Sequence, residues 1–129
     1  MKLKDAAVLF VEDEPFLRDS IGAWLSRKAG RVLCAQHGPE ALEILAANKI
    51  DLLLTDLHMP VMDGMAIIKR IPKDRPRPRL ILVTGSTDPV PQEARELDVD
   101  AVVEKPINRE ELLAAMRNCL GDADEVNKQ

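Results

Sequence analysis

The sequence predicts an α/β fold in which a five-stranded parallel sheet carries helices on both faces. Short apolar runs recur five times along the chain, and segments with helical spacing lie between them. The apolar runs are nearly continuous rather than alternating, which is typical of strands whose two faces are both covered. Strands and helices in regular alternation indicate a doubly wound sheet with right-handed crossovers.

The five strands are expected where apolar and β-branched residues gather in runs too short for helices. These runs cover residues 7–11, 32–35, 52–54, 80–83 and 101–103.

The first two helices are indicated by apolar residues at helical spacing. One is predicted from Pro15 to about Ala29, with Gly30 in a left-handed cap after it. The second is predicted from Pro39 to Asn48, because proline suits the first turn of a helix.

The remaining three helices are predicted from apolar spacing together with start and stop signals. The third holds apolar residues at Met62, Met65, Ile68 and Ile71 and must end at Pro72. A short fourth helix is expected over residues 91–97. A fifth should begin after the N-cap Asn108 and end at Gly121.

Length and composition indicate one soluble domain. The 129 residues fit a single domain over residues 1–121, a polar tail over 122–129 and no separate output domain. A net charge of -4 argues against direct nucleic-acid binding, which needs a basic face. Without a signal segment or a run of about 20 apolar residues, we expect a cytoplasmic protein with no membrane contact and no disulfide framework.

Charged and hydroxyl side chains follow the predicted strands at their carboxyl ends, where open parallel sheets bind ligands. The first strand runs into Glu12 and Asp13, the third ends at Asp56, the fourth ends at Thr84, and the fifth reaches Lys105. The excess of carboxylates would be relieved by a hard divalent cation, and Mg²⁺ fits best because it accepts one or two carboxylates and phosphate oxygens. A metal, a lysine and a hydroxyl together indicate a phosphoryl site. Asp56 is the candidate nucleophile, since a carboxylate can form an acyl phosphate.

Four motifs at these positions resemble the receiver domain of two-component response regulators. They are Glu12-Asp13, Asp56-Leu-His-Met-Pro-Val-Met-Asp-Gly64, Val-Thr84-Gly-Ser86 and Glu-Lys105-Pro106-Ile. The likeness covers residues 6–120. It implies a chemotaxis-receiver-like fold with the flavodoxin-like strand order 2-1-3-4-5.

The resemblance implies that Asp56 accepts a phosphoryl group in a Mg²⁺-dependent step. The donor would be a sensor histidine kinase or a histidine phosphotransfer protein, and phosphorylation would switch binding to a downstream protein target. Such a domain catalyses only its own phosphorylation and dephosphorylation, so it is not expected to be an enzyme acting on free substrates.

The resemblance also implies a role for each site residue. Asp13 and Asp56 would ligate the metal directly, Glu12 would act through a coordinated water, and the backbone carbonyl of His58 would complete the protein ligands. In addition, Thr84 would hydrogen-bond the phosphoryl oxygens and Lys105 would pair with the remaining charge. The Lys105-Pro106 peptide would be cis.

Two residues depart from the usual pattern of this family. Glu12 stands where aspartate is commoner, and Val102 stands where tyrosine or phenylalanine usually couples to the threonine. The chain contains no tyrosine at all, so the aromatic half of the usual switch cannot operate here.

Residues around the predicted site could form the surface that docks the phosphoryl donor. Glu14, Pro15, Arg18 and Pro106 are the rim candidates. For Leu17 we expect core packing rather than partner contact.

Other functions remain open at the level of sequence. The domain could be a single-domain regulator or phosphorelay intermediate, or a receiver cut from a hybrid kinase or longer regulator. A Mg²⁺-dependent aspartyl-phosphate phosphohydrolase would need a second aspartate at position 58, where this chain has histidine. A flavodoxin-like cofactor binder is disfavoured because the acids would repel a flavin phosphate and no phosphate-cradling loop follows the first strand.

Overall fold

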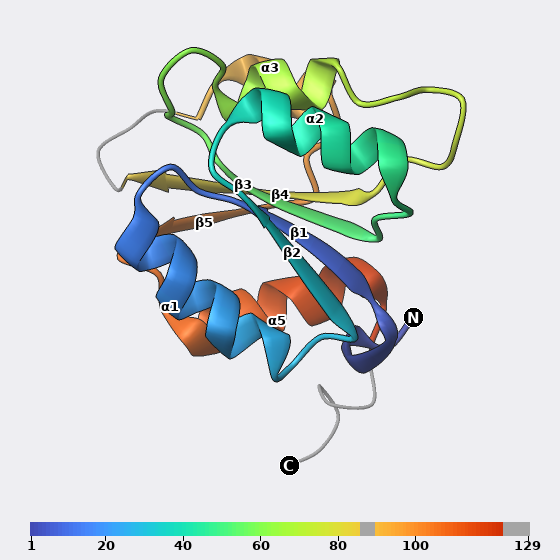
Figure 1. The fold of residues 1–129 in the computed structure, drawn as a ribbon, viewed down its shortest axis with the longest axis vertical. Coiled ribbons are helices and arrows are strands. Elements are labelled where there is room, and N and C mark those ends of the chain that lie inside the picture. The colour runs from blue at the N-terminus through green and yellow to red at the C-terminus, as the bar shows by residue number, and fades with distance from the viewer. Residues whose placement is uncertain (86–89, 123–129) are drawn as a thin grey trace.

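The sheet is parallel throughout and has five strands in the order β2-β1-β3-β4-β5, as predicted. This computed structural model describes residues 1–85 and 90–122. The strands are β1 (Ala7–Val11), β2 (Arg31–Ala35), β3 (Leu52–Asp56), β4 (Arg79–Gly85) and β5 (Ala101–Lys105). Helices lie above and below this sheet in three layers (Figure 1).

Three strands continue past their apolar runs to the polar residues predicted at their carboxyl ends. β3 includes Asp56, β4 includes Thr84, and β5 reaches Lys105. The pairing of Asp56 with Val83, and of Gly85 with Lys105, keeps the ladder intact to these ends. The polar residues are therefore held by regular sheet rather than by loops.

The helices are α1 (Pro15–Ser26), α2 (Gly38–Ala47), α3 (Gly64–Lys69), α4 (Gln92–Glu96) and α5 (Arg109–Leu120). α2 and α4 lie within about one residue of their predicted bounds. α5 begins as predicted, because the Glu111 amide donates to the Asn108 side chain over 3.0 Å. It also ends as predicted, since Gly121 is left-handed with φ 71°.

The predicted end of α1 was wrong. The helix ends at Ser26, three residues early, and its cap Arg27 is right-handed. Gly30 is not left-handed. Instead, a Cβ at Gly30 would lie 2.7 Å from the Lys4 carbonyl oxygen, so glycine is needed there for close packing against the start of the chain.

The predicted start of α3 was also wrong. Met62 lies before the helix, which begins at Gly64 behind an aspartate cap. The Asp63 carboxylate accepts from the Ala66 amide over 2.8 Å. A cap of this kind fixes the first turn, and the tight turn before it leaves Val61 with φ 71°.

Replacing Val61 with Asn should stabilise the protein by about 1 kcal/mol. A β-branched residue in the left-handed region is strained by roughly 1–2 kcal/mol, whereas Asn tolerates that region. The Val61 side chain is 97% exposed, so little apolar contact is lost. Urea unfolding measures the gain. Val102→Asn, at an exposed position on β5 without positive φ, is the control, and an equal gain there would contradict the strain explanation.

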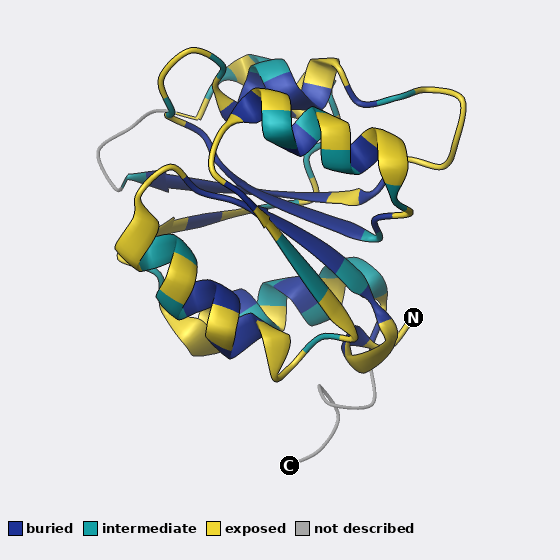
Figure 2. Cartoon of the chain, viewed as in Figure 1, coloured by how far each residue is buried: buried dark blue, intermediate teal, exposed yellow. Residues whose placement is uncertain are grey.

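Two apolar clusters lie on opposite faces of the sheet. One joins the sheet to α2, α3 and α4 through residues such as Leu45, Ile67 and Ala94. The other joins it to α1 and α5 through residues such as Leu25 and Leu112. Figure 2 shows the buried residues concentrated in the sheet and on the inner faces of the helices. Both faces are thus covered, as the continuous apolar runs predicted.

The only tryptophan of the chain, Trp24, belongs to the cluster under α1 and α5. It is 8% exposed. The Arg109 guanidinium lies 5.5 Å from the centre of its ring, within range of a cation–π contact. This contact joins the start of α5 to the last turns of α1.

The two ends of the described chain meet beside α5. A short 3₁₀ helix, Leu3–Asp5, precedes β1. The Leu3 amide donates to the Asp122 carboxylate over 2.9 Å. Asp122, which we expected to open the polar tail, is therefore buried against the domain. The rest of that tail, residues 123–129, lies outside the described residues, as does Ser86 of the third motif.

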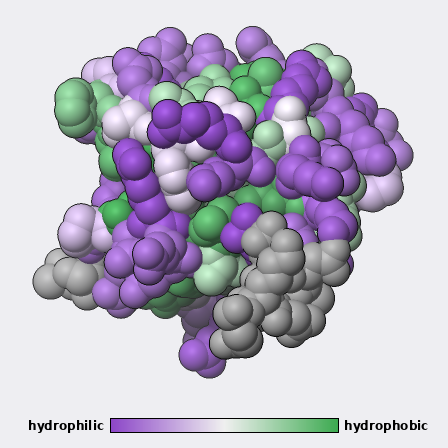
Figure 3. All heavy atoms as spheres, turned by 90° about the horizontal axis from the view of Figure 1, so that it is seen from below, coloured by the Kyte–Doolittle hydropathy of each residue, from purple (hydrophilic) through white to green (hydrophobic). Residues whose placement is uncertain are grey.

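The outer surface of the layers is mostly polar. On the face seen in Figure 3, hydrophilic residues dominate and hydrophobic ones form small separate groups. Among the described residues, no helix has the length and apolar character needed to cross a membrane.

Candidate functional site

The carboxyl ends of β1, β3, β4 and β5 bring the predicted polar residues to one edge of the sheet. Glu12 and Asp13 directly follow β1, and Asp56 is the last residue of β3. Ligand oxygens of these three carboxylates lie within 4.8 Å of one another. Glu12 and Asp56 are buried whereas Asp13 is exposed, so the cluster opens to solvent on the side of Asp13.

Lys105 joins two of these carboxylates. Its Nζ donates to Asp56 Oδ2 over 2.7 Å and lies 3.1 Å from Glu12 Oε1. The position of Lys105 at the end of β5, two strands away from Asp56, requires its long side chain to reach across the edge of the sheet. One ammonium therefore bridges the ends of β1 and β3.

Local contacts hold Glu12 in place. Its Oε2 accepts from the Glu14 amide over 3.1 Å, and its backbone carbonyl accepts from Arg18 Nη1 over 3.0 Å. The Glu12 side chain is only 1% exposed. Glu12, which stands where aspartate is commoner, is thus buried, and its two carboxylate oxygens contact the Glu14 amide and Lys105.

The remaining two predicted site residues lie near the carboxylates. Thr84 is buried on β4, one residue beyond the Val83 that pairs with Asp56. His58 lies two residues after Asp56 and is exposed. The structure thus brings Glu12, Asp13, Asp56 and Lys105 into one cluster and places Thr84 and His58 beside it.

Gly64 is a residue whose role sequence reasoning missed. A Cβ on Gly64 would lie 2.6 Å from the Asp56 backbone carbonyl. The Gly64 amide also donates to the Leu57 carbonyl over 2.9 Å. Any side chain there would push the segment that holds Asp56 out of position. The Asp-Gly pair at the end of the second motif was the available signal.

Burial and charge act in opposite directions within the cluster. Burial raises the pKa of Glu12, while hydrogen bonds from the Glu14 amide and Lys105 counteract part of this effect. For Lys105, burial lowers the pKa, but the hydrogen bonds and attraction from Asp56 and Glu12 outweigh it and leave the pKa raised. The lysine is therefore held in its charged form.

The raised pKa of Lys105 predicts a loss of stability at alkaline pH. The folded protein holds this proton more tightly than the unfolded chain, so the contribution of Lys105 is complete below its ordinary pKa of 10.5 and is lost as the pH rises through the raised value. Urea unfolding between about pH 8 and pH 12 measures it. The fall should be smaller in Lys105→Met than in wild type or Lys28→Met, an exposed control. Equal slopes in all three would contradict the assignment.

The donor set suits a hard divalent cation. Three carboxylates within reach of one another offer only oxygen atoms, and Mg²⁺ prefers oxygen ligands. One lysine offsets part of their charge and leaves the cluster negative. The residues present therefore fit a Mg²⁺ ion.

Comparison with known families decides the family to which this fold belongs. The profile of the family described as "Response regulator receiver domain" matches residues 8–117. The chain belongs to this family.

Curated relatives of this receiver domain are regulators and a sensor kinase. The transcriptional regulatory protein GlrR of Escherichia coli is 33% identical over 93% of the chain, which spans 27% of GlrR. The response regulator MprA of Mycobacterium sp. (strain KMS) is 36% identical over 88% of the chain, which spans 50% of MprA. The autoinducer 1 sensor kinase/phosphatase LuxN of Vibrio harveyi is 32% identical over 89% of the chain, and the matched region spans 13% of LuxN. The receiver domain thus spans half or less of these relatives.

Solved structures show the same fold. The chemotaxis response regulator CheY4 of Vibrio cholerae aligns with a TM-score of 0.80 at 28% identity, over 89% of this chain and 98% of CheY4. A receiver domain protein from Clostridium thermocellum aligns with a TM-score of 0.78 at 28% identity, over 94% and 98% of the two chains.

Residues at the rim of the receiver domain combine structural contacts with exposure to solvent. Leu17 packs against the core, as predicted. Its neighbour Phe16 is 81% exposed beside the acidic cluster. Glu14 accepts hydrogen bonds from the Phe16 and Leu17 amides as the cap of α1, and Arg18 holds the Glu12 carbonyl. Two of the four rim candidates, Glu14 and Arg18, thus make structural contacts. Phe16 adds a large exposed apolar side chain to the rim.

The Lys105-Pro106 peptide is cis, as the resemblance implied.

Proposed function

We propose that this receiver domain accepts a phosphoryl group from a sensor histidine kinase or a histidine phosphotransfer protein onto Asp56, and that this reaction depends on Mg²⁺. Phosphorylation in turn switches binding to a downstream protein target. The observation that carries the proposal is the convergence of three carboxylates with Lys105 bonded directly to Asp56.

Four groups of the chain would hold the ion. They are the carboxylates of Glu12, Asp13 and Asp56 and the backbone carbonyl of His58. When bound, Mg²⁺ supplies positive charge that offsets the charge of the carboxylates and of the incoming phosphoryl oxygens.

The transfer step uses the carboxylate of Asp56 as nucleophile. One of its oxygens forms a bond to phosphorus while the bond from phosphorus to the donor histidine nitrogen breaks, and that nitrogen keeps the electron pair. The product is an acyl phosphate on Asp56. Because Asp56 is only 5% exposed, the donor must deliver the phosphoryl group at the open side of the cluster, next to Asp13.

Lys105 and Thr84 stabilise the added charge. The Lys105 ammonium, now 2.7 Å from Asp56 Oδ2, turns to a phosphoryl oxygen, and the Thr84 hydroxyl donates to another. Neither contact requires a proton to leave the lysine, since its pKa is raised.

The signal passes to the surface without the usual aromatic residue. Thr84 pairs with Glu104 in the ladder between β4 and β5, and Val102 on β5 is 42% exposed. We infer that engagement of Thr84 shifts the end of β4 against β5 and alters the surface around Val102. A small aliphatic residue there offers a partner a flat contact in both states.

Intact mass after incubation with acetyl phosphate and Mg²⁺ tests the proposed function. We expect one added phosphoryl group, and none when EDTA removes the metal, because the uncompensated carboxylates repel the donor. Peptide mapping should place the group on Asp56. If neither acetyl phosphate nor a panel of phosphorylated histidine kinases labels the chain, and beryllofluoride with Mg²⁺ leaves its NMR spectrum unchanged, the proposal is wrong.

A further inference from the structure

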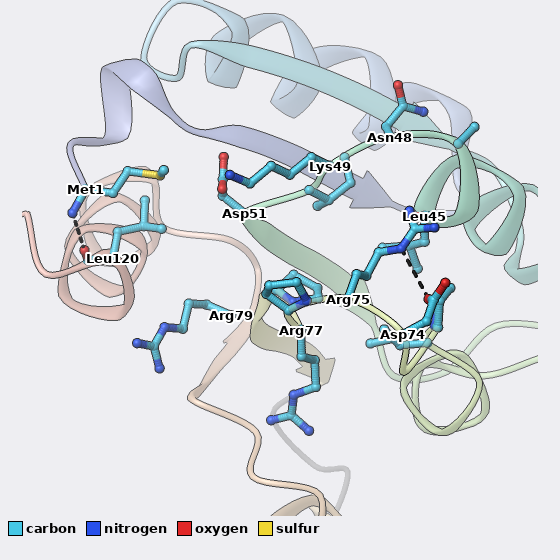
Figure 4. A pocket seen from close by; sticks show the side chains of 16 residues that line it. Met1, Leu45, Asn48, Lys49, Asp51, Asp74, Arg75, Arg77, Arg79 and Leu120 are labelled. Atoms are coloured by element: carbon cyan, nitrogen blue, oxygen red, sulfur yellow. Dashed lines mark hydrogen bonds and ion pairs between the residues drawn. The ribbon is translucent and has the colours of Figure 1, made fainter.

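A hollow of about 720 Å³ lies at the edge of the sheet opposite the acidic cluster. Its walls come from the end of α2, the segments that enter β3 and β4, and Leu120 at the end of α5 (Figure 4). These are the amino ends of the strands, whereas Asp56 and Lys105 lie at the carboxyl ends. The hollow is therefore separate from the proposed phosphoryl site, and its volume suits a small organic ligand.

The charge around this hollow is opposite to that of the whole chain. Six of the 18 basic residues fall within residues 69–79, which contain one acid, although the chain carries a net charge of -4. Four cationic side chains line the hollow: Lys49, Arg75, Arg77 and Arg79. The two acids that line it are Asp51 and Asp74. This edge of the domain therefore favours an anion.

Two of the arginines fix the shape of the hollow. Arg75 Nη1 donates to the carbonyls of Leu45 and Ala46 at the end of α2, over 3.3 and 3.0 Å. Arg77 donates to the carbonyls of Leu97 and Asp98 beyond α4, over 2.6 and 2.9 Å. Each guanidinium meets the negative end of a helix. Hydrogen bonds to two helix ends thus fix the proline-rich loop, residues 73–79, without a ligand.

The other two cations are available to a ligand. The Arg79 side chain is 61% exposed and lies 3.8 Å from Asp100, too far for a strong hydrogen bond. Within the described part of the chain, Lys49 has no ion pair with a carboxylate. Asp51, by contrast, is occupied by the Ala7 amide over 2.8 Å. Phosphate oxygens would suit Lys49 and Arg79.

The remaining wall of the hollow is apolar. It is formed by Leu45, Ile50, Ile71, Pro72, Pro76, Pro78 and Leu120. A bare phosphate ion would leave this apolar wall exposed to water, whereas a ligand with a flat apolar ring would cover it. The ligand class therefore combines anionic groups with a ring.

We propose that this hollow binds a free nucleotide, with its phosphates at Lys49 and Arg79 and its base against the prolines and aliphatic side chains. Single-stranded nucleic acid is disfavoured, because such sites stack successive bases on aromatic rings. The three aromatic residues of the chain are Phe10, Phe16 and Trp24, and none of them lines the hollow.

Titration of the ¹⁵N-labelled chain with AMP, ADP, ATP and GTP tests the proposal, with EDTA present so that the acidic cluster binds no metal-nucleotide complex. We expect saturable shifts confined to residues 45–51 and 71–79, with a dissociation constant below about 1 mM for at least one nucleotide. Lys49→Gln and Arg79→Gln should each weaken binding by about tenfold or more, since each removes a charge-assisted hydrogen bond. Arg27→Gln and Lys28→Gln, exposed between α1 and β2 and outside the lining of the hollow, should leave it unchanged.

Four results would overturn the nucleotide assignment. They are the absence of saturable binding by all four nucleotides, equal loss in the control variants, pyrophosphate binding as tight as that of ADP, and a single-stranded oligonucleotide that binds far more tightly than ATP. Urea unfolding of each variant confirms that it is folded. Because the experiment does not use Asp56 or Mg²⁺, its outcome is independent of the proposed phosphoryl transfer.

Discussion

Asp56→Asn should take up no phosphoryl group from acetyl phosphate or from a phosphorylated kinase. The amide that replaces the carboxylate has no anionic oxygen to attack phosphorus, so the acyl phosphate cannot form. Mg²⁺ should also bind more weakly, because one of the three clustered carboxylates is lost. Intact mass measures the first effect, and an NMR titration with Mg²⁺ measures the second.

The substitution should leave the fold intact, which makes the loss of labelling specific. Asn has the shape of Asp, and its Oδ1 can still accept a hydrogen bond from Lys105, which also keeps its partner Glu12. We expect the free energy of unfolding to change by no more than about 1 kcal/mol. Asp19→Asn, at an exposed position on α1, is the matched control and should be labelled like wild type. Labelling of Asp56→Asn at the wild-type rate would show that another residue is the acceptor.

Leu54→Ala should lower the free energy of unfolding by about 3 kcal/mol or more. Leu54 is fully buried in the central strand β3, where it is paired with Phe10 on β1 and Ile81 on β4. Removal of its methyl groups loses their transfer free energy and leaves a cavity that flanking strands cannot fill. For a domain whose total stability is about 5–15 kcal/mol, this is a large fraction.

Urea unfolding followed by far-UV circular dichroism measures this loss. The transition midpoint should fall while the slope stays near the wild-type value, because the same surface is exposed on unfolding. Leu42→Ala, the same change at a half-buried position on α2, should cost less than half as much. If the two substitutions cost the same, the core around the central strand is not the main source of stability.

The layers of the fold were predictable because they depend on local patterns. Continuous apolar runs identify strands that are covered on both faces, and Asn108 and Gly121 mark the ends of α5 by chemistry within a few residues. The end of α1 was not predictable in this way. The residues around Gly30 are typical of a helix cap, but glycine is needed there because it packs against the Lys4 carbonyl. A local sequence pattern does not reveal a contact between separate segments.

The candidate site likewise has a part that the sequence predicts and a part that it does not. Strand ends with polar residues predicted that Glu12, Asp13, Asp56 and Lys105 would meet, since topology alone brings them to one edge. The role of Gly64 against the Asp56 carbonyl and that of Arg18 on the Glu12 carbonyl depend on backbone atoms, which every residue has. No pattern of side chains signals such contacts.

The basic loop over residues 73–79 shows the same limit of local patterns. Residues 73–79 contain charges and prolines, the usual composition of an exposed turn. Only the folded chain places Arg75 at the end of α2 and Arg77 beyond α4. The loop is thus a brace between two helices on one face of the sheet.

The position of Trp24 determines what intrinsic fluorescence can report about this protein. The single tryptophan lies between α1 and α5, so its emission follows the release of that one layer. The layer of α2, α3 and α4 contains no fluorescent side chain, because the chain has one tryptophan and no tyrosine. Coincidence of the fluorescence and circular dichroism transitions would show that both layers unfold together as one cooperative unit. An earlier fluorescence transition would show that the Trp24 side opens first.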